Sequence, residues 1–215
     1  MSRGTLTLLH TAAAHVPRFG ALLAELAPAV SVRHAVCETL LEGARDLGVE
    51  NLEVQRRLGE VVAGLAQSSP VVLCTCSTLG AAAEALGGTF GARVLRVDRP
   101  LAQAAVAGGE RIAVVAALAS TLEPTRALLE DEAARAGKPV TLTLSVCTGA
   151  WEHFERGDED SYLRAVAAHA DRVQVEADVV VLAQASMAGA EAFVRTPKPV
   201  LSSPRLGVLG ALELL

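Results

Sequence analysis

Short runs of β-branched and aliphatic residues alternate along the chain with longer stretches of helical periodicity. Continuous apolar strands between helices are typical of parallel sheets that helices cover on both faces. The apolar runs predict eight strands, at Thr5–Leu9, Ser31–Val36, Val71–Cys76, Arg93–Val97, Arg111–Ala117, Val140–Val146, Asp178–Gln184 and Pro199–Ser202. The helical patterns include Phe19–Leu26, Leu52–Ala66, Ala81–Leu86, Leu122–Ala136, Tyr162–Val173 and Ala188–Val194. The alternation predicts an α/β fold.

The chain also divides into two similar halves. In each half a first strand is followed by a helix, and a later strand ends in small polar residues, VVLCTCST at 71–78 and VVVLAQAS at 179–186. We therefore predict two pseudo-symmetric, Rossmann-like lobes, each with a mostly parallel sheet of about four strands flanked by helices. The first lobe is expected to span residues 1–98, with 199–215 returning to it, and the second to span 99–198.

Small or polar residues follow four of the predicted strands. Parallel α/β sheets bind ligands outside the carboxyl ends of their strands, so these clusters are the candidate site. They are His10-Thr11, Cys76-Ser77-Thr78, Ala119-Ser120-Thr121 and Gln184-Ala185-Ser186. None carries a fixed formal charge, and hydroxyls with backbone N–H groups suit a small anion.

Cys76 is the candidate chemical centre. It precedes a Gly/Ala-rich helical stretch at 79–86, and the positive end of a helix dipole favours a thiolate by lowering its pKa. A thiolate can act as a nucleophile or as a proton-transfer base. The alternative is a packed core thiol, since cysteine is among the most buried residue types. Cys74, deeper on the same face of the strand, is expected to be such a core residue.

Several short segments, in order along nearly the whole chain, resemble the aspartate/glutamate racemase superfamily. Residues 76–78 resemble the Cys-Asn/Ser-Thr turn that carries the first catalytic cysteine of that family. Val97-Asp98-Arg99-Pro100, followed by Ala104-Ala105, resembles the crossover into the second lobe. Residues 111–125 (RIAVVAALASTLEPT) resemble the strand and Thr-rich turn that hold the substrate carboxylate. Residues 178–187 (DVVVLAQASM) resemble the strand that normally ends in Gly-Cys-Thr.

The resemblance implies a cofactor-independent (hence PLP-independent) isomerase with its site in the cleft between two lobes. Family racemases commonly place one thiol on each face of the acidic α-carbon. In this chain Gln184 stands where the second thiol is expected, and Ser186 where a histidine is expected. Ala117 replaces a Thr, and His10-Thr11 replaces an Asp-Ser pair. An amide accepts no proton near neutral pH, which argues against a symmetric two-thiol mechanism.

The leading hypothesis is a racemase-like isomerase that transfers a proton at the carbon alpha to a carboxylate. Cys76 would be the acid/base thiol, with His10 as its partner. Substrate-binding residues would come from the four strand ends: Thr11, Ser77, Thr78, Ser120, Thr121, Gln184, Ala185 and Ser186. The substrate, a small amino acid or other carboxylic acid, is left open. One alternative is a single-thiol decarboxylase or lyase of the same superfamily, and another is a non-catalytic small-anion binding protein.

Charge and cysteine content limit the classes of molecule that the protein is expected to bind. The formal net charge of −5, without a basic stripe, argues against a general nucleic-acid binder. An apolar run long enough to span a membrane is absent from the sequence. Four cysteines without a metal-type CxxC pair are expected to be reduced thiols of a cytoplasmic protein that holds no metal. The apolar content of 51% is compatible with a homo-oligomer.

Overall fold

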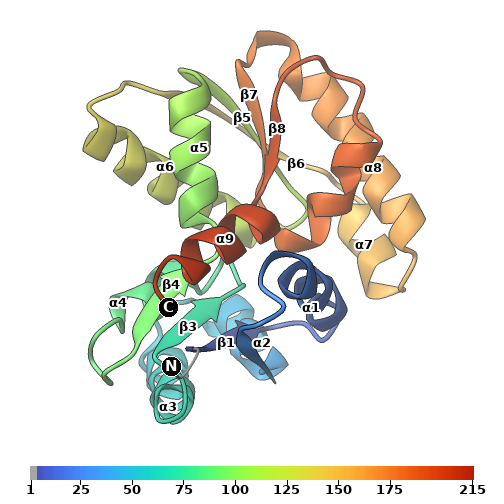
Figure 1. The fold of residues 1–215 in the computed structure, drawn as a ribbon. Coiled ribbons are helices and arrows are strands. Elements are labelled where there is room, and N and C mark those ends of the chain that lie inside the picture. Colours follow the sequence, from blue (N-terminus) through green and yellow to red (C-terminus); the bar gives the residue numbers. More distant parts are fainter. Residues whose placement is uncertain (1–3) are drawn as a thin grey trace. The chain divides into compact units, whose positions relative to one another are not determined.

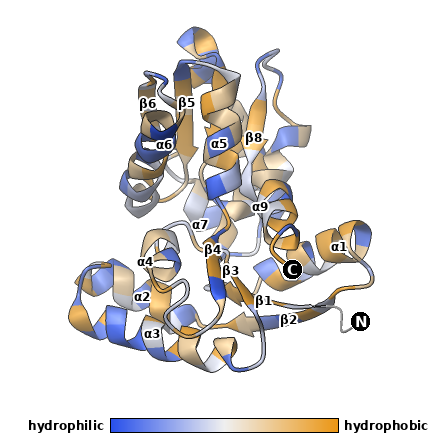
Figure 2. Cartoon of the chain, turned by 60° about the vertical axis from the view of Figure 1, so that its left-hand side comes forward, coloured by the Kyte–Doolittle hydropathy of each residue, from blue (hydrophilic) through white to orange (hydrophobic). Residues whose placement is uncertain are grey.

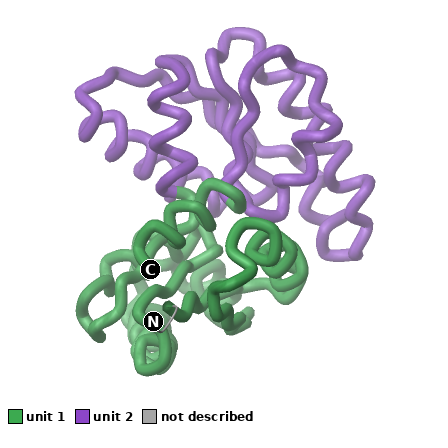
Figure 3. Tube along the Cα trace, in the orientation of Figure 1, with its two compact units in different colours: residues 1–98, 204–215 green, residues 99–203 purple. Residues whose placement is uncertain are grey.

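The computed structural model describes residues 4–215, which form two compact units (Figures 1 and 3). Unit 1 contains the chain up to Asp98 together with Pro204–Leu215, and unit 2 contains Arg99–Ser203. Each unit is built on one four-stranded parallel sheet with helices packed against it. The predicted α/β class with two lobes is confirmed.

The two sheets have the same topology. In unit 1 the order is β2-β1-β3-β4, with bounds β1 Thr5–His10, β2 Ser31–Val36, β3 Val71–Cys74 and β4 Arg93–Arg96. In unit 2 the order is β6-β5-β7-β8, with bounds β5 Arg111–Ala116, β6 Thr141–Val146, β7 Val179–Leu182 and β8 Val200–Ser202. The repeated order accounts for the similarity between the two halves of the sequence.

Burial explains the strand patterns. The inner strands β3 and β7 are buried at every position, as their continuous apolar sequences require. The edge strands β2 and β6 begin with alternating exposed and half-buried residues. β3 ends at Cys74, two residues before the predicted end, because after the bond from Thr75 N–H to Leu9 O the chain leaves the ladder. Cys76 therefore lies in the loop beyond the strand.

The core of unit 1 lies between its sheet and three helices, α2 (Glu38–Leu47), α3 (Leu52–Ala66) and α4 (Gly80–Ala85). Apolar side chains of these helices, including Leu40, Leu58 and Ala83, cluster with Leu9, Val72 and Cys74 of the strands. Two further helices complete the unit, α1 (His15–Leu26) and α9 (Ser203–Leu212). Hydrophobic and hydrophilic faces are visible on α2 and α3 in Figure 2.

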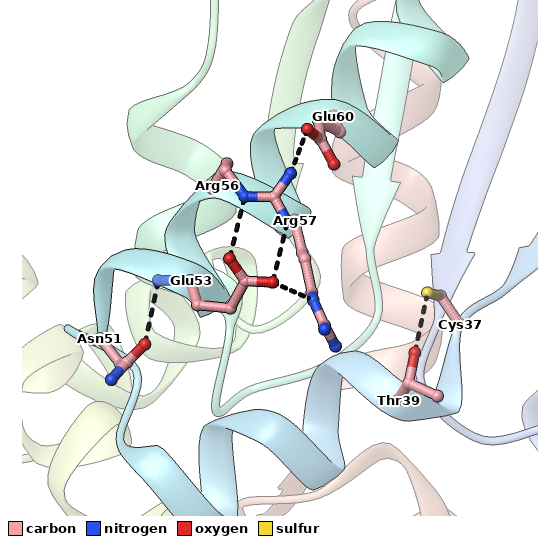
Figure 4. A network of polar contacts seen from close by, with 7 residues as sticks. All are labelled: Cys37, Thr39, Asn51, Glu53, Arg56, Arg57 and Glu60. Atoms are coloured by element: carbon pink, nitrogen blue, oxygen red, sulfur yellow. Dashed lines mark hydrogen bonds and ion pairs between the residues drawn. The ribbon is translucent and has the colours of Figure 1, made fainter.

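The outward face of α3 carries an ion-pair network (Figure 4). Asn51 caps the helix by accepting from Glu53 N–H, and the Glu53 carboxylate pairs with Arg56 and Arg57. These side chains are exposed, where ion pairs are screened by water. The network therefore marks the solvent side of the helix.

Unit 2 contains the helices α5 (Arg99–Gly108), α6 (Leu122–Ala136), α7 (Ala150–Glu155) and α8 (Glu159–Val173). Short 3-10 segments cover Ala119–Thr121, Gln174–Glu176 and Ala185–Ala192. The last of these stands where an ordinary helix was predicted at 188–194.

The point of return to unit 1 differs from the predicted residue 199. Val180 of β7 pairs with Val200, so β8 completes the second sheet. The return begins at Pro204 in α9. Gly207 makes this packing close, since a Cβ there would lie 2.4 Å from Val97 O.

Within residues 4–215, no helix is long and apolar enough to cross a membrane. The same residues contain no group of three or more His, Cys, Asp or Glu side chains placed to hold a metal ion.

Candidate functional site

Cys76 is buried just beyond the carboxyl edge of the first sheet, in the neighbourhood of three donors. The Thr11 hydroxyl, in the loop after β1, and the backbone N–H groups of Thr78 and Leu79, in the turn into α4, each act to lower the pKa of its thiol. Cys76 itself is 6% exposed. Hydrogen bonds of this kind stabilise a sulfur that carries negative charge. The local geometry therefore suits a sulfur that alternates between thiol and thiolate.

The resting form of this sulfur differs from the expected thiolate. Burial raises the pKa of the Cys76 thiol above its ordinary value, although the three donors act in the opposite direction. Desolvation outweighs them because a charged sulfur loses its hydration in the core. The structure has the helix N–H donors that the sequence pattern predicts next to Cys76, but the expected lowering of its pKa is wrong, since sequence does not report burial depth.

His10, the proposed partner of Cys76, is fully buried, and both its ring nitrogens are occupied. The Thr75 hydroxyl donates to Leu9 O (3.2 Å) and therefore accepts from His10 Nδ1–H, at 2.8 Å. His10 Nε2 is then the acceptor for His34 Nδ1–H, at 2.9 Å. The ring is thus tied to Thr75, the residue before Cys76.

Burial also decides the charge of this histidine. Desolvation, with smaller contributions from His15 and His34, lowers the pKa of His10 to about 3. His15, whose ring centroid lies 6.1 Å from that of His10, has its pKa lowered to about 4, mainly by burial. At neutral pH both rings are therefore uncharged.

The carboxyl edge of the second sheet presents Gln184. Its Oε1 accepts from the backbone N–H of Ala117 at 2.5 Å and from that of Leu118 at 3.2 Å. The oxygen is therefore fixed on the end of β5. Both donors of Nε2 remain available, since among the described residues they make no hydrogen bond. Gln184 accordingly presents N–H groups, which bind an anionic oxygen and do not accept a proton.

The remaining predicted binding residues differ in environment. Ser77 and Thr78 are buried in the turn that surrounds Cys76. In unit 2, Thr121 is buried, whereas Ser120 beside it is exposed. Ala185 is buried at the start of the 3-10 segment after β7.

Ser186 lies 2.8 Å from the hydroxyl of Tyr162, a buried residue of α8. In the sequence, Tyr162 stood out only as the start of a helical pattern. A signal was available, because a buried tyrosine hydroxyl normally has a polar partner. The partner itself could not be read from the sequence, since 24 residues separate the two.

Two other cysteines lie apart from these contacts. Cys147 is buried and its thiol donates to Ala165 O at 3.4 Å. Cys37, half-buried at the start of α2, lies 3.7 Å from the Thr39 hydroxyl (Figure 4). Neither follows β7, the strand after which the sequence resemblance predicts a second thiol.

Comparison with known proteins identifies the fold of the chain. No protein-family model matches the chain, and no curated protein matches it. Solved structures do match. A glutamate racemase isoform from Bacillus anthracis is 16% identical with a TM-score of 0.72, and the match covers 98% of this chain and 80% of that one. An allantoin racemase from Pseudomonas fluorescens is 19% identical with a TM-score of 0.66, covering 98% and 89%. An unliganded arylmalonate decarboxylase is 20% identical with a TM-score of 0.61, covering 98% and 92%. The chain has the fold that these two racemases and the decarboxylase share.

One charged feature of this racemase fold was not predicted from the sequence. Arg96, the last residue of β4, and Asp98 form a buried ion pair, with Nε–Oδ1 at 2.7 Å and Nη2–Oδ2 at 3.0 Å. Asp98 entered the sequence argument only as part of the crossover resemblance. An arginine that ends an apolar strand, two residues before an aspartate, is a signal that could have drawn attention to the pair.

Proposed function

We propose that the protein is a racemase-like enzyme that transfers a proton at the carbon alpha to the carboxylate of a small substrate, without a cofactor. Cys76 is the acid/base group. The observation that carries the proposal is a buried sulfur beyond the carboxyl edge of a parallel sheet, where the Thr11 hydroxyl and two backbone N–H groups act to lower the pKa of its thiol. Solved racemases share the fold.

The reaction requires a carbanion or enediolate that the protein stabilises. As a base, the Cys76 thiolate takes the α-proton and becomes a thiol, and the electron pair of the broken C–H bond moves into the carboxylate. As an acid, the thiol returns a proton to carbon and becomes a thiolate. The fixed Nε2 donors of Gln184 suit the negative oxygen of such an intermediate. Ser77 and Thr78 of the first unit are proposed to hold a substrate carboxylate. Thr11 is proposed to join them when its hydroxyl exchanges the Cys76 sulfur for a carboxylate oxygen.

In unit 2, the hydroxyls of Ser120, Thr121 and Ser186 and the backbone of Ala185 stay predicted substrate-binding groups. The hydroxyls are neutral donors, suited to a carboxylate. That they serve one substrate together with Cys76 stays a prediction, as do the cytoplasmic location, the homo-oligomer and the absence of a cofactor.

A second candidate follows from the fixed amide of Gln184. Inversion at carbon needs a proton-transferring group on each face, and an amide held as a donor cannot serve as the second one. Decarboxylation needs only one. Loss of CO₂ leaves the electron pair on the α-carbon, and the Cys76 thiol protonates that carbon from a single face. An arylmalonate decarboxylase is among the solved structures with this fold.

His10 is proposed to act mainly by holding neighbouring groups in position. Its Nδ1–H holds Thr75, and its Nε2 is occupied by His34, so the ring fixes the end of the strand that leads to Cys76. Direct proton transfer by His10 stays a prediction. It requires the ring to exchange one of these partners for substrate.

The test is isotope exchange over a defined panel. Chiral α-amino acids, α-hydroxy acids and disubstituted malonates are incubated with the protein in deuterated water, followed by NMR, chiral chromatography and CO₂ detection. Inversion with α-deuterium uptake supports the isomerase, and CO₂ release supports the decarboxylase. Cys76→Ala should abolish either activity, whereas Cys37→Ala, the matched thiol control, should retain it. Activity that survives in Cys76→Ala rejects the assigned role, and binding without exchange or CO₂ favours a small-anion binding protein.

A further inference from the structure

Unit 1 contains a groove of about 230 Å³ between α1 and β2. Its walls come from Gly20, Leu23 and Ala24 of α1, from the connection that follows, and from Val32 and His34 of β2. Apart from His34, the lining residues are glycine, proline or aliphatic. A cavity of about 150 Å³ with apolar walls holds one benzene molecule. The groove therefore has room for one substituted six-membered ring.

A chain of hydrogen bonds fixes which nitrogen of His34 carries the proton. The Thr75 hydroxyl donates to Leu9 O and accepts from His10 Nδ1–H. His10 Nε2 then accepts from His34 Nδ1–H. A neutral imidazole has one N–H, so His34 Nε2 is left with a lone pair. Among the residues that the structure describes, this nitrogen has no hydrogen-bond partner, and it is free to accept one from a ligand.

Gly20 leaves the space beside this nitrogen open. A Cβ on Gly20 would lie 3.9 Å from His34 Nε2 and would meet no other atom within 4 Å. A side chain at this position of α1 would therefore extend into the groove and cover the nitrogen. The glycine keeps the lone pair of His34 accessible from the groove.

The groove offers no charge to a ligand at neutral pH. Burial lowers the pKa of His34, so its ring is uncharged, and the other lining side chains carry no ionisable group. A charged ligand would lose hydration here without gaining a partner of opposite charge. The groove is therefore unsuited to the carboxylates proposed as substrates and suits a neutral, mainly apolar molecule.

We propose that the groove between α1 and β2 binds a small apolar molecule with one hydroxyl, such as a phenol, and that this hydroxyl donates to His34 Nε2. The apolar walls contact the ring of the ligand. A ligand that accepts a hydrogen bond would instead require an Nε2–H on His34. The rings of His34 and His10 would then have to exchange their proton positions, and the Thr75 hydroxyl would lose its bond to Leu9 O. The proposal holds whether or not Cys76 transfers a proton.

Two matched probes test the need for a hydroxyl. 4-Fluorophenol carries it, and 4-fluoroanisole has the same ring with a methyl ether in its place. Each is titrated into the full chain and followed by fluorine NMR. The wild-type protein should bind the phenol about threefold to tenfold more tightly than the anisole, which is the range expected for one hydrogen bond. His34→Leu removes the acceptor and should bind the two probes alike.

A second variant locates the binding site. Gly20→Leu fills the space beside His34 Nε2 and should abolish binding of both probes. Gly64→Leu is the matched control, because a Cβ at this exposed position of α3 meets nothing within 4 Å, and it should keep the wild-type affinities. Gly20→Leu leaves the bond between His34 and His10 in place, so it provides the test if His34→Leu does not fold.

Long-range proton–nitrogen NMR of the wild-type protein shows where the protons lie. Without ligand, His10 and His34 should both be Nδ1–H tautomers, and the phenol, but not the anisole, should shift the resonance of His34 Nε2. An Nε2–H tautomer at His34, equal affinity for the two probes, no detectable binding, or full binding in Gly20→Leu would overturn the proposal. A phenol affinity that falls as the protein concentration rises would show that a second copy of the chain fills the groove, and would overturn it as well.

Discussion

The side-chain oxygen of Gln184 lies 2.5 Å from the backbone nitrogen of Ala117. Through this contact, and a second one to Leu118 N–H, the second residue after β7 binds the backbone just beyond the end of β5. The amide therefore has two consequences. It stabilises the strand end, and it fixes the direction of two N–H donors.

Replacing Gln184 by Met should lower the free energy of unfolding by about 1–3 kcal/mol, because it leaves the buried Ala117 N–H without a partner while keeping a similar side-chain volume. Chemical denaturation measures the loss. Gln103→Met, at an exposed position of α5, is the control and should change stability by about 0.5 kcal/mol or less. Equal stability of Gln184→Met and wild type would show that the hydrogen bonds contribute nothing.

In Thr11→Val the pKa of the Cys76 thiol should rise. The midpoint pH for alkylation of Cys76 by iodoacetamide, measured by peptide mass spectrometry, should therefore move to higher pH. The change removes the hydroxyl donor from the sulfur and leaves burial, which raises the pKa, less opposed. The matched control is Thr39→Val, which removes the hydroxyl beside Cys37 (Figure 4) and should not affect Cys76. An unchanged or lower midpoint in Thr11→Val would contradict the donor role of the Thr11 hydroxyl.

Stability should decrease as the pH falls below about 6.5. The pKa of His10 is lowered to about 3 and that of His15 to about 4, so between pH 6.5 and 4 the unfolded chain binds protons that the folded chain does not. Each histidine then costs about 1.4 kcal/mol per pH unit. Urea denaturation at pH 7.5 and pH 5 measures the loss. It should be smaller in His10→Gln by about 2 kcal/mol, and an equal loss in both proteins would show that His10 titrates normally when folded.

Gly207→Ala should destabilise the protein by about 1–3 kcal/mol, since the new Cβ meets the Val97 carbonyl, a backbone atom that cannot turn aside. Gly59→Ala is the control, because a Cβ at that position of α3 meets nothing within 4 Å. In that helix interior alanine should stabilise by about 0.5–1 kcal/mol. Thermal unfolding of the two variants should therefore shift in opposite directions. A shift in the same direction would argue against close packing of α9 on the chain after β4.

The sequence by itself determined the class of the fold and the position of the candidate thiol at a strand end. Apolar runs such as Val71–Cys74 are periodic and local, and burial on both faces of a parallel strand leaves a continuous hydrophobic signature. The polar residues that follow two inner strands were also visible, although β3 ends at Cys74 and β7 at Leu182, two residues before Cys76 and Gln184.

Only the tertiary structure decided the state of those groups. Whether Cys76 rests as thiol or thiolate depends first on burial, which raises the pKa of its thiol. His10 is tied to Thr75 across 65 residues, and Ser186 to Tyr162 across 24. Desolvation and hydrogen-bond partners are properties of the packed interior, and a linear pattern of polar and apolar residues does not contain them.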